Sequence, residues 1–157
     1  MRVSVQETDF DVGAETEALT AGRPDVGAVA SFVGYVRADK LAGENAADQA
    51  VSAMTLEHYP GMTEKSLEAI AAEAQSRWSL LGVRVIHRFG RLVPGDRIVF
   101  VGVAGSHRGE AFAACEFIMD YLKTRAPFWK KEDTPDGGRW VDAREADDAA
   151  AEKWGKA

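Results

Sequence analysis

The apolar positions of the chain recur with two different spacings, which predict strands and helices in mixed order. Short runs of alternating or continuous apolar residues predict strands at residues 2–6, 27–36, 51–58, 83–93, 96–104 and 128–132. Apolar residues at helical spacing predict helices at residues 12–21, 63–78, 107–124 and 145–154. This order indicates an α+β fold in which helices pack on one sheet.

Local residue choices define several of these boundaries. Residues 27–36 combine β-branched and aromatic side chains, which indicates a buried strand. The Pro-Gly pair within residues 93–96 suits a type II turn and predicts an antiparallel hairpin between the strands on either side. Thr63 and Ser106 are suited to cap the helices that follow them, and Pro127 forces an exit from the long third helix.

The long helix carries an apolar stripe and one residue that departs from it. The stripe consists of Ala111, Cys115, Ile118 and Leu122. Cys115 lies in the middle of the helix with no adjacent base on that face, so we interpret it as a small buried apolar residue rather than a nucleophile. Phe117 points away from the stripe, which suggests a second packing surface. It is the only residue whose position suggests self-association.

Length and composition fit a single domain over residues 1–157. The chain is 46% hydrophobic and 28% charged, close to the averages of globular proteins. A chain of this size can bury a core without metal ions or disulfides. Residues 38–50 are small and polar with no period, and they predict a mobile loop.

Charge and cysteine usage exclude several classes of protein. The net charge of −6 argues against general nucleic-acid binding, although it allows a small cationic pocket. One cysteine excludes an internal disulfide and favours a reducing compartment, from which we expect a cytoplasmic protein. The start of the chain turns polar at once, and no apolar run approaches the ~18 residues of a membrane span, so neither a signal peptide nor a membrane helix is predicted.

One candidate site lies at the start of the long helix, in residues 105–109 (GSHRG). The free backbone N–H groups and the positive end of the helix dipole favour an anion there. Arg108 adds a guanidinium that matches phosphate oxygens, and His107 adds a switchable donor. A capped helix with two exposed polar residues is an equally good interpretation of the same residues.

A second candidate site follows from the cationic residues at the end of that helix. Lys123, Arg125, Lys130 and Lys131 are interleaved with Pro127, Phe128 and Trp129. Bulky apolar neighbours and nearby cations favour a neutral lysine that can act as a general base or acid. Alternatively, these cations only interact favourably with the negative C-terminal end of the helix dipole. This interpretation explains Lys123 and Arg125 better than the two lysines beyond the helix.

Two further sets of residues give weaker evidence of a functional site. Arg37 follows a predicted strand, where it could face a ligand, but alone it is more often a surface charge. His58 and His87 lie far apart in sequence without metal-ligand spacing, so no zinc site is predicted.

Several strings of the chain strongly resemble the large, catalytic subunit of molybdopterin synthase. They are residues 56–63 (LEHYPGMT), 85–88 (VIHR), 94–96 (PGD) and, above all, 117–132 (FIMDYLKTRAPFWKKE). The last string is long and highly specific, and the resemblance covers about residues 25–154.

The resemblance implies an activity, partners and a fold. The activity is insertion of two sulfurs into cyclic pyranopterin monophosphate, which forms the dithiolene of molybdopterin. The sulfur arrives as a thiocarboxylate on the C-terminal Gly-Gly tail of a small ubiquitin-like subunit, in a heterotetramer built on a dimer of large subunits. The fold is an α/β hammerhead with an added antiparallel subdomain. Neither a cofactor nor a metal is implied.

The resemblance also implies roles for particular residues. The essential lysines fall on Lys123 and Lys130. Substrate contacts fall on Tyr35, Val36, Arg37, His107, Arg108, Lys131 and Glu132, with Arg144 as a weaker candidate.

The spacing within the long helix leads to a hypothesis about how a site is shared. His107 and Lys123 are 16 positions apart, which corresponds to roughly 24 Å along a continuous helix. One pterin phosphate cannot easily touch both ends. We therefore expect each site to combine Lys123 and Lys130 of one protomer with His107 and Arg108 of its dimer mate.

Two alternatives to this function remain open from the residues. The chain could be a dimeric scaffold that only docks a ubiquitin-like partner, in which case it would not need two lysines in a pocket. It could also be a phosphate-ester hydrolase or an acyl transferase that uses the same cations. The second alternative lacks a visible nucleophile–base pair or metal-ligand set.

Overall fold

A computed structural model describes residues 2–38, 53–134, 137–141 and 145–155 of the chain. The loop expected at 38–50 therefore lies, apart from its first residue, outside the described residues, as does the candidate substrate contact Arg144.

The described elements follow the predicted order along the chain, except that the strand predicted at 83–93 is divided in two and that the strand Gly137–Val141 was not predicted. The strands are β1 Val3–Gln6, β2 Ala28–Tyr35, β3 Ala53–His58, β4 Leu80–Arg88, β5 Gly90–Leu92, β6 Arg97–Gly105, β7 Phe128–Thr134 and β8 Gly137–Val141. The helices are α1 Val12–Thr20, α2 Met62–Arg77, α3 Arg108–Arg125 and α4 Glu145–Gly155. The α+β class is confirmed.

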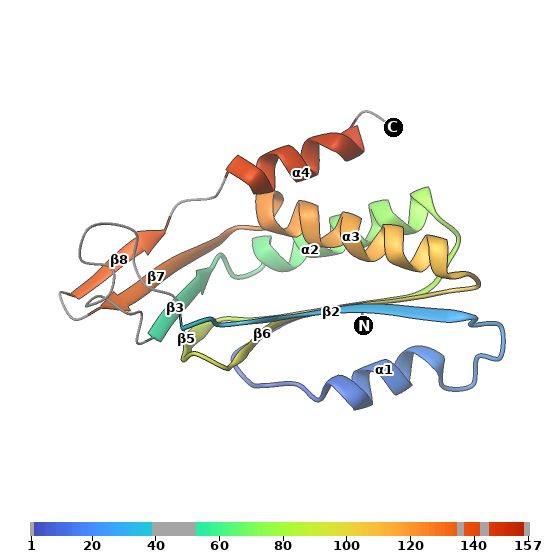
Figure 1. Ribbon diagram of the computed structural model, residues 1–157, viewed down its shortest axis with the longest axis horizontal. Coiled ribbons are helices and arrows are strands. Elements are labelled where there is room, and N and C mark those ends of the chain that lie inside the picture. Colours follow the sequence, from blue (N-terminus) through green and yellow to red (C-terminus); the bar gives the residue numbers. More distant parts are fainter. Residues whose placement is uncertain (1, 39–52, 135–136, 142–144, 156–157) are drawn as a thin grey trace.

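The larger layer of the molecule is a four-stranded sheet with helices on both faces. Its strand order is β1-β4-β6-β2, with β1 parallel to β4 and the other pairs antiparallel. Figure 1 shows α2 and α3 along one face, α4 beyond them, and α1 alone against the opposite face. Each face therefore has its own core, a large one under α2 and α3 and a small one around Phe10, Ile86 and Phe100 beside α1.

A second, smaller sheet extends from one end of the first. Its order is β5-β3-β7-β8, and all its pairs are antiparallel. The expectation of one sheet is thus wrong, whereas the antiparallel subdomain that the resemblance implied is present. The strand predicted at 83–93 divides because Gly90, at φ +90°, turns the chain out of β4 and into β5.

Two other local predictions have different outcomes. The turn at 93–96 is confirmed, since Gly95 has φ +96° and the Asp96 N–H donates to the Val93 carbonyl at 2.9 Å. The strand at 27–36 exists but is not buried as predicted. It lies at the sheet edge as β2, where Phe32 is 42% and Tyr35 51% exposed.

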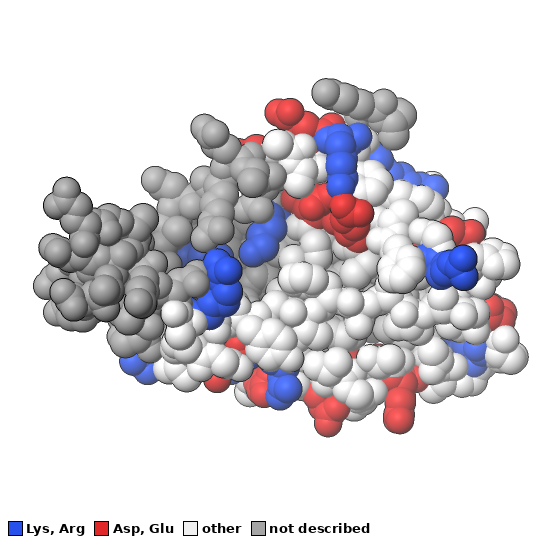
Figure 2. All heavy atoms as spheres, viewed as in Figure 1, with Lys and Arg blue, Asp and Glu red and all other residues white. Residues whose placement is uncertain are grey.

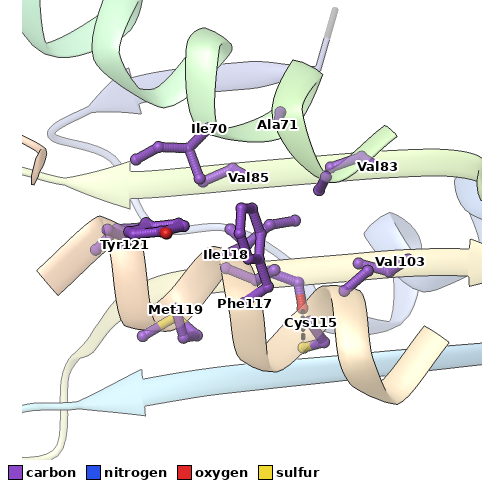
Figure 3. Close-up of a cluster of buried hydrophobic side chains, with 14 of the residues drawn as sticks. Ile70, Ala71, Val83, Val85, Val103, Cys115, Phe117, Ile118, Met119 and Tyr121 are labelled. Carbon is purple, nitrogen blue, oxygen red and sulfur yellow. Dashed lines mark hydrogen bonds between the residues drawn. The ribbon is translucent and has the colours of Figure 1, made fainter. Parts of the chain in front are cut away.

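The main core lies between α3, α2 and the first sheet, and it corrects the interpretation of Phe117. Figure 3 shows Phe117, Ile118 and Tyr121 of α3 among Ile70 of α2 and Val85 of β4. Phe117 is fully buried, and its ring meets those of Trp78, Tyr121 and Trp154 edge-on. Its second packing surface therefore lies within the same chain and gives no hint of a dimer.

In the part of the chain that the structure describes, no helix combines the length and apolarity that crossing a bilayer requires.

Candidate active site

Helix α3 separates the two candidate sites by its full length. It runs without interruption from Arg108 to Arg125, so His107 and Lys123 lie at opposite ends, as the spacing predicted. Ser106 was expected to cap this helix, but His107 occupies the N-cap position and makes no side-chain capping hydrogen bond. Residues 106–109 are all exposed. The first turn thus presents its N–H groups beside a histidine and an arginine.

At the other end of α3 the chain passes directly into β7, which carries the second lysine. Phe128 and Lys130 lie on one face of β7, because side chains alternate along a strand. Opposite them on β3 are His58 and Leu56. Lys130 is partly buried on this inner face.

Lys131 belongs to the other face of the same strand. It alternates with Lys130 and lies on the side of Trp129, which is 48% exposed. Glu132 pairs through its backbone register with Met54 and Arg139. The two adjacent lysines that the sequence grouped together therefore point to different surroundings.

A buried histidine packs against the start of β7, the strand that carries the second candidate lysine. His87, on β4, is 6% exposed, and its ring stacks on that of Phe128 with centroids 3.7 Å apart and planes 21° apart. Burial is the main cause that lowers the pKa of His87 to about 3; the hydrogen bond to Arg88 opposes the shift, and the positive charges of Lys123 and Lys130 contribute to it. Lys123, which is exposed, and Lys130, which is partly buried, are both within electrostatic range of this ring.

The turn between α3 and β7 is held in place by a residue of α2. The hydroxyl of Thr63 donates to the Pro127 carbonyl at 3.0 Å and accepts from the Tyr59 N–H at 3.0 Å. Thr63 is completely buried. Gly61, not Thr63, is the N-cap of α2, so the capping role predicted for this threonine is wrong.

The end of β2 approaches the same region from the first sheet. Val36 is buried against Leu56 and Met54, the β3 neighbours of β7, and its N–H and carbonyl bond to Asp96 and Gly95. This packing leads Arg37, which is exposed, out beside the second sheet. Val36 thus fixes the main chain at this point.

Tyr35 lies beside the ion pair of Arg97 and Asp9. It pairs with Arg97 across a bulge, and Arg97 is joined to Asp9 by hydrogen bonds of 3.0 and 2.6 Å. Arg97 and Asp9 also line a cavity of about 440 Å³ at the start of α1. Neither this cavity nor one of about 250 Å³ near Arg84 is lined by the lysines or His107.

Basic side chains lie where β7 leaves the helices, on a molecule that is acidic as a whole. Figure 2 shows basic side chains over that region, and basic and acidic side chains mixed over the helices and the α1 side. No three histidine, cysteine, aspartate or glutamate side chains gather as metal ligands among the residues described. The local chemistry is that of amines and a neutral imidazole.

Cys115 is confirmed as a buried apolar residue. It is 8% exposed in the main core, and burial raises the pKa of its thiol to about 11. Its sulfur contacts the Val101 carbonyl at 3.9 Å. A thiol held protonated in this way is a poor sulfur donor or nucleophile.

Sequence reasoning missed His87 and the anchoring role of Thr63. His87 has the same parity on β4 as Val83 and Val85, which are buried against α2 and α3. A histidine at a core position of a strand was the available signal. The sequence could not show that His87 lies near His58 and the lysines, because this depends on where the second sheet packs.

Comparison with known proteins gives consistent results. The MoaE protein family matches residues 5–125. A molybdopterin synthase catalytic subunit from Ralstonia nicotianae is 61% identical over 153 residues, which are 98% of this chain and 84% of that protein.

Solved structures agree with this match. The molybdopterin biosynthesis MoaE protein from Burkholderia ambifaria is 58% identical, with a TM-score of 0.81 over 98% of this chain and 97% of that one. Molybdopterin synthase from Staphylococcus aureus is 28% identical, with a TM-score of 0.78 over 88% of this chain and 96% of that one.

Proposed function

The chain belongs to the MoaE protein family, and from this premise we propose how its residues carry out the work of a molybdopterin synthase catalytic subunit. The enzyme is a sulfurtransferase that moves sulfur from the C-terminal thiocarboxylate of a small ubiquitin-like subunit to cyclic pyranopterin monophosphate. The product is the dithiolene of molybdopterin.

One observation carries the assignment of the catalytic residues. Lys123 and Lys130 belong to different elements, yet both act electrostatically on the same buried imidazole. The α3–β7 turn that joins them is anchored by Thr63 and stacked on His87. Two amines that a fixed turn carries into range of one ring can position an anionic thiocarboxylate and exchange protons as sulfur adds to the pterin and the phosphate ring opens.

The remaining candidates bind substrate in this proposal. Arg37, His107 and Arg108 hold the phosphate, since an arginine matches its oxygens and a helix start favours an anion. Tyr35 and Val36 complete the strand end that presents Arg37. Lys131 and Glu132 follow the second lysine along β7.

A single chain does not bring all these groups together, because α3 holds Lys123 and His107 about its own length apart. Each site therefore takes Lys123 and Lys130 from one protomer and His107 and Arg108 from its dimer mate. The assembly is a heterotetramer with a dimer of this chain at its centre. It works in the cytoplasm as one domain of residues 1–157.

A product assay tests the function. The chain is incubated with thiocarboxylated small subunit and cyclic pyranopterin monophosphate, and dithiolene formation is followed. The wild-type chain and Cys115→Ala are both expected to form product, because the sulfur comes from the partner. A folded but inactive Cys115→Ala would contradict the external sulfur source.

The same assay separates catalysis from docking. If the chain only docked its partner, Lys123→Ala and Lys130→Ala would bind the small subunit and lose no turnover. Loss of turnover with binding retained supports the enzyme.

A further inference from the structure

His87 is a buried titratable side chain to which the proposed chemistry assigns no role. It belongs to the first sheet, and its ring stacks on Phe128, the first residue of β7 in the second sheet. His58 and Phe89 form a second ring pair, tilted at 34° with 4.2 Å between centroids, and His58 is the register partner of Phe128. Four rings thus join the two sheets beside the lysines.

Phe128 is well placed to control the geometry of both lysines. It lies two residues before Lys130, on the same face of β7, and five residues after Lys123. The preceding residue, Pro127, is held by Thr63 through its carbonyl. Successive residues of the turn are therefore fixed by two different elements, Pro127 by α2 and Phe128 by β4.

We propose that His87 is a positioning residue that sets the placement of Lys130 relative to Lys123 by holding the ring of Phe128 against the first sheet. This inference rests on the catalytic roles proposed for the two lysines. His87 touches neither substrate nor reacting atoms in this role and acts through the stack.

The chemistry of imidazole explains why a histidine can serve here. Its Nδ1–H donates to the Arg88 carbonyl at 2.8 Å, and this bond fixes the ring plane on which Phe128 rests. The charged groups acting on the ring are Lys123, Lys130 and His58. Burial and these neighbours keep the imidazole neutral at physiological pH, so the stack adds no positive charge that would push the ammonium groups apart.

Two substitutions and one control test the proposal in the assembled complex. His87→Ala removes the stacking ring, and His87→Phe keeps a ring but removes both nitrogens. Phe10→Ala is the control, because Phe10 is a ring of similar burial that pairs with Phe100 on the opposite, α1 face of the same sheet. Each variant is assayed for kcat, for the KM of the pterin, for small-subunit affinity and for the folded fraction.

The proposal predicts a separation of kcat from binding. His87→Ala should lower kcat per folded molecule by about tenfold to a hundredfold, since misplacing a reacting group by an ångström has an effect of that size. KM and small-subunit affinity should change less than about twofold, because the groups assigned to the phosphate, Arg37, His107 and Arg108, lie outside the stack. His87→Phe should recover most of kcat, and Phe10→Ala should lose stability without losing kcat per folded molecule.

Three results would overturn it: wild-type kcat in His87→Ala, a His87→Phe as slow as His87→Ala, or an equal loss of kcat in Phe10→Ala. Lys123→Ala and Lys130→Ala are assayed alongside. If these are fully active, the proposed catalytic roles fail. If they are inactive while His87→Ala is normal, only the positioning role fails.

Discussion

The two ends of α3 carry similar polar groups in very different surroundings. At the C-terminal end, β7, β4 and α2 close around the turn that follows Lys123, and Thr63 and His87 hold that turn at successive residues. At the N-terminal end, residues 106–109 are all exposed and no side chain caps the first turn. One end is organised by the chain itself, while the other presents its groups outward.

This difference shows which part of the site a single chain can preorganise. Amines that exchange protons need a precisely placed backbone, and the buried junction of two sheets fixes the turn between the exposed Lys123 and the partly buried Lys130. A phosphate-binding helix start needs only directed N–H groups and a cation, and these act on any anion brought to the surface. The exposed end is therefore suited to complete the site of a second protomer.

Removing either amine tests the organised end and should give the largest effect. Lys123→Ala and Lys130→Ala are expected to lower turnover by about 10² to 10⁴-fold, the usual range for loss of a general acid or base. Small-subunit binding, measured by calorimetry, should be retained. Lys65→Ala, an exposed lysine of α2, is the matched control and should turn over normally. Turnover within about twofold of wild type in either active-site variant would sink the assignment.

Removing the cation at the exposed end should have a smaller effect, directed at substrate binding. Arg108→Ala is expected to lower kcat/KM by about tenfold to a hundredfold, because charge-assisted hydrogen bonds are worth about 1.5–3 kcal/mol. Arg125→Ala, at the other end of the same helix and joined to Glu73 by a surface ion pair, is the control. Equal losses in the two variants would argue against a phosphate site at the helix start.

Mixing two inactive chains tests whether the ends cooperate across a dimer. Equal amounts of Lys123→Ala and His107→Ala chains are unfolded together and refolded. About a quarter of the wild-type activity should return, because half of the dimers are mixed and each mixed dimer holds one intact site. Recovery is read from dithiolene formation, and a mixture no more active than its components would show that the site lies within one chain.

The buried imidazole predicts a dependence of stability on pH. The pKa of His87 is lowered from 6.5 to about 3 in the folded protein, so the unfolded chain takes up a proton in this range and the folded chain does not. Stability is then complete above pH 6.5 and falls toward pH 3, by up to about 1.4 kcal/mol per pH unit for one proton.

Urea unfolding at several pH values measures how the unfolding free energy changes with pH. In His87→Phe this slope should be smaller by the contribution of the one proton that His87 takes up on unfolding. Asp9 provides a separate check, because Arg97 lowers the pKa of its carboxyl from 3.8 to about 2. Its contribution is present above pH 3.8 and is lost only as the pH falls through 2. An unchanged slope between pH 6 and 4 in His87→Phe would contradict the buried neutral state.

The smallest effect is expected from the anchor of the α3–β7 turn. Thr63→Val keeps the shape of the side chain but leaves the Tyr59 N–H and the Pro127 carbonyl without their partner, at a cost of about 1–3 kcal/mol in unfolding free energy. Urea unfolding measures the loss. Thr63→Ser, which keeps the hydroxyl, should lose clearly less, and equal losses would mean that packing, not the hydrogen bonds, holds the turn.

Periodicity predicted most element positions because each depends on residues close in sequence. The continuous helix that separates His107 from Lys123 follows from the stripe of Ala111, Cys115, Ile118 and Leu122, and the structure confirms it. The division of the predicted strand at 83–93 was missed, because the sequence does not show which glycine adopts a positive φ, and β5 is defined by its pairing with the distant β3. The edge position of β2 was missed for a similar reason, since apolar content does not specify the number of strand neighbours.

The sequence by itself determined most of the element order, the buried and inert character of Cys115, the resemblance carried by residues 117–132 and the separation between the two ends of α3. Only the tertiary structure decided that Lys130 is partly buried while Lys131 is exposed, and that Phe117 packs within its own chain. Only the tertiary structure brought His87 from β4 to the lysines as well. The reason is physical: spacing along a helix or strand is a local property, whereas contacts between elements depend on how two sheets and several helices share one core.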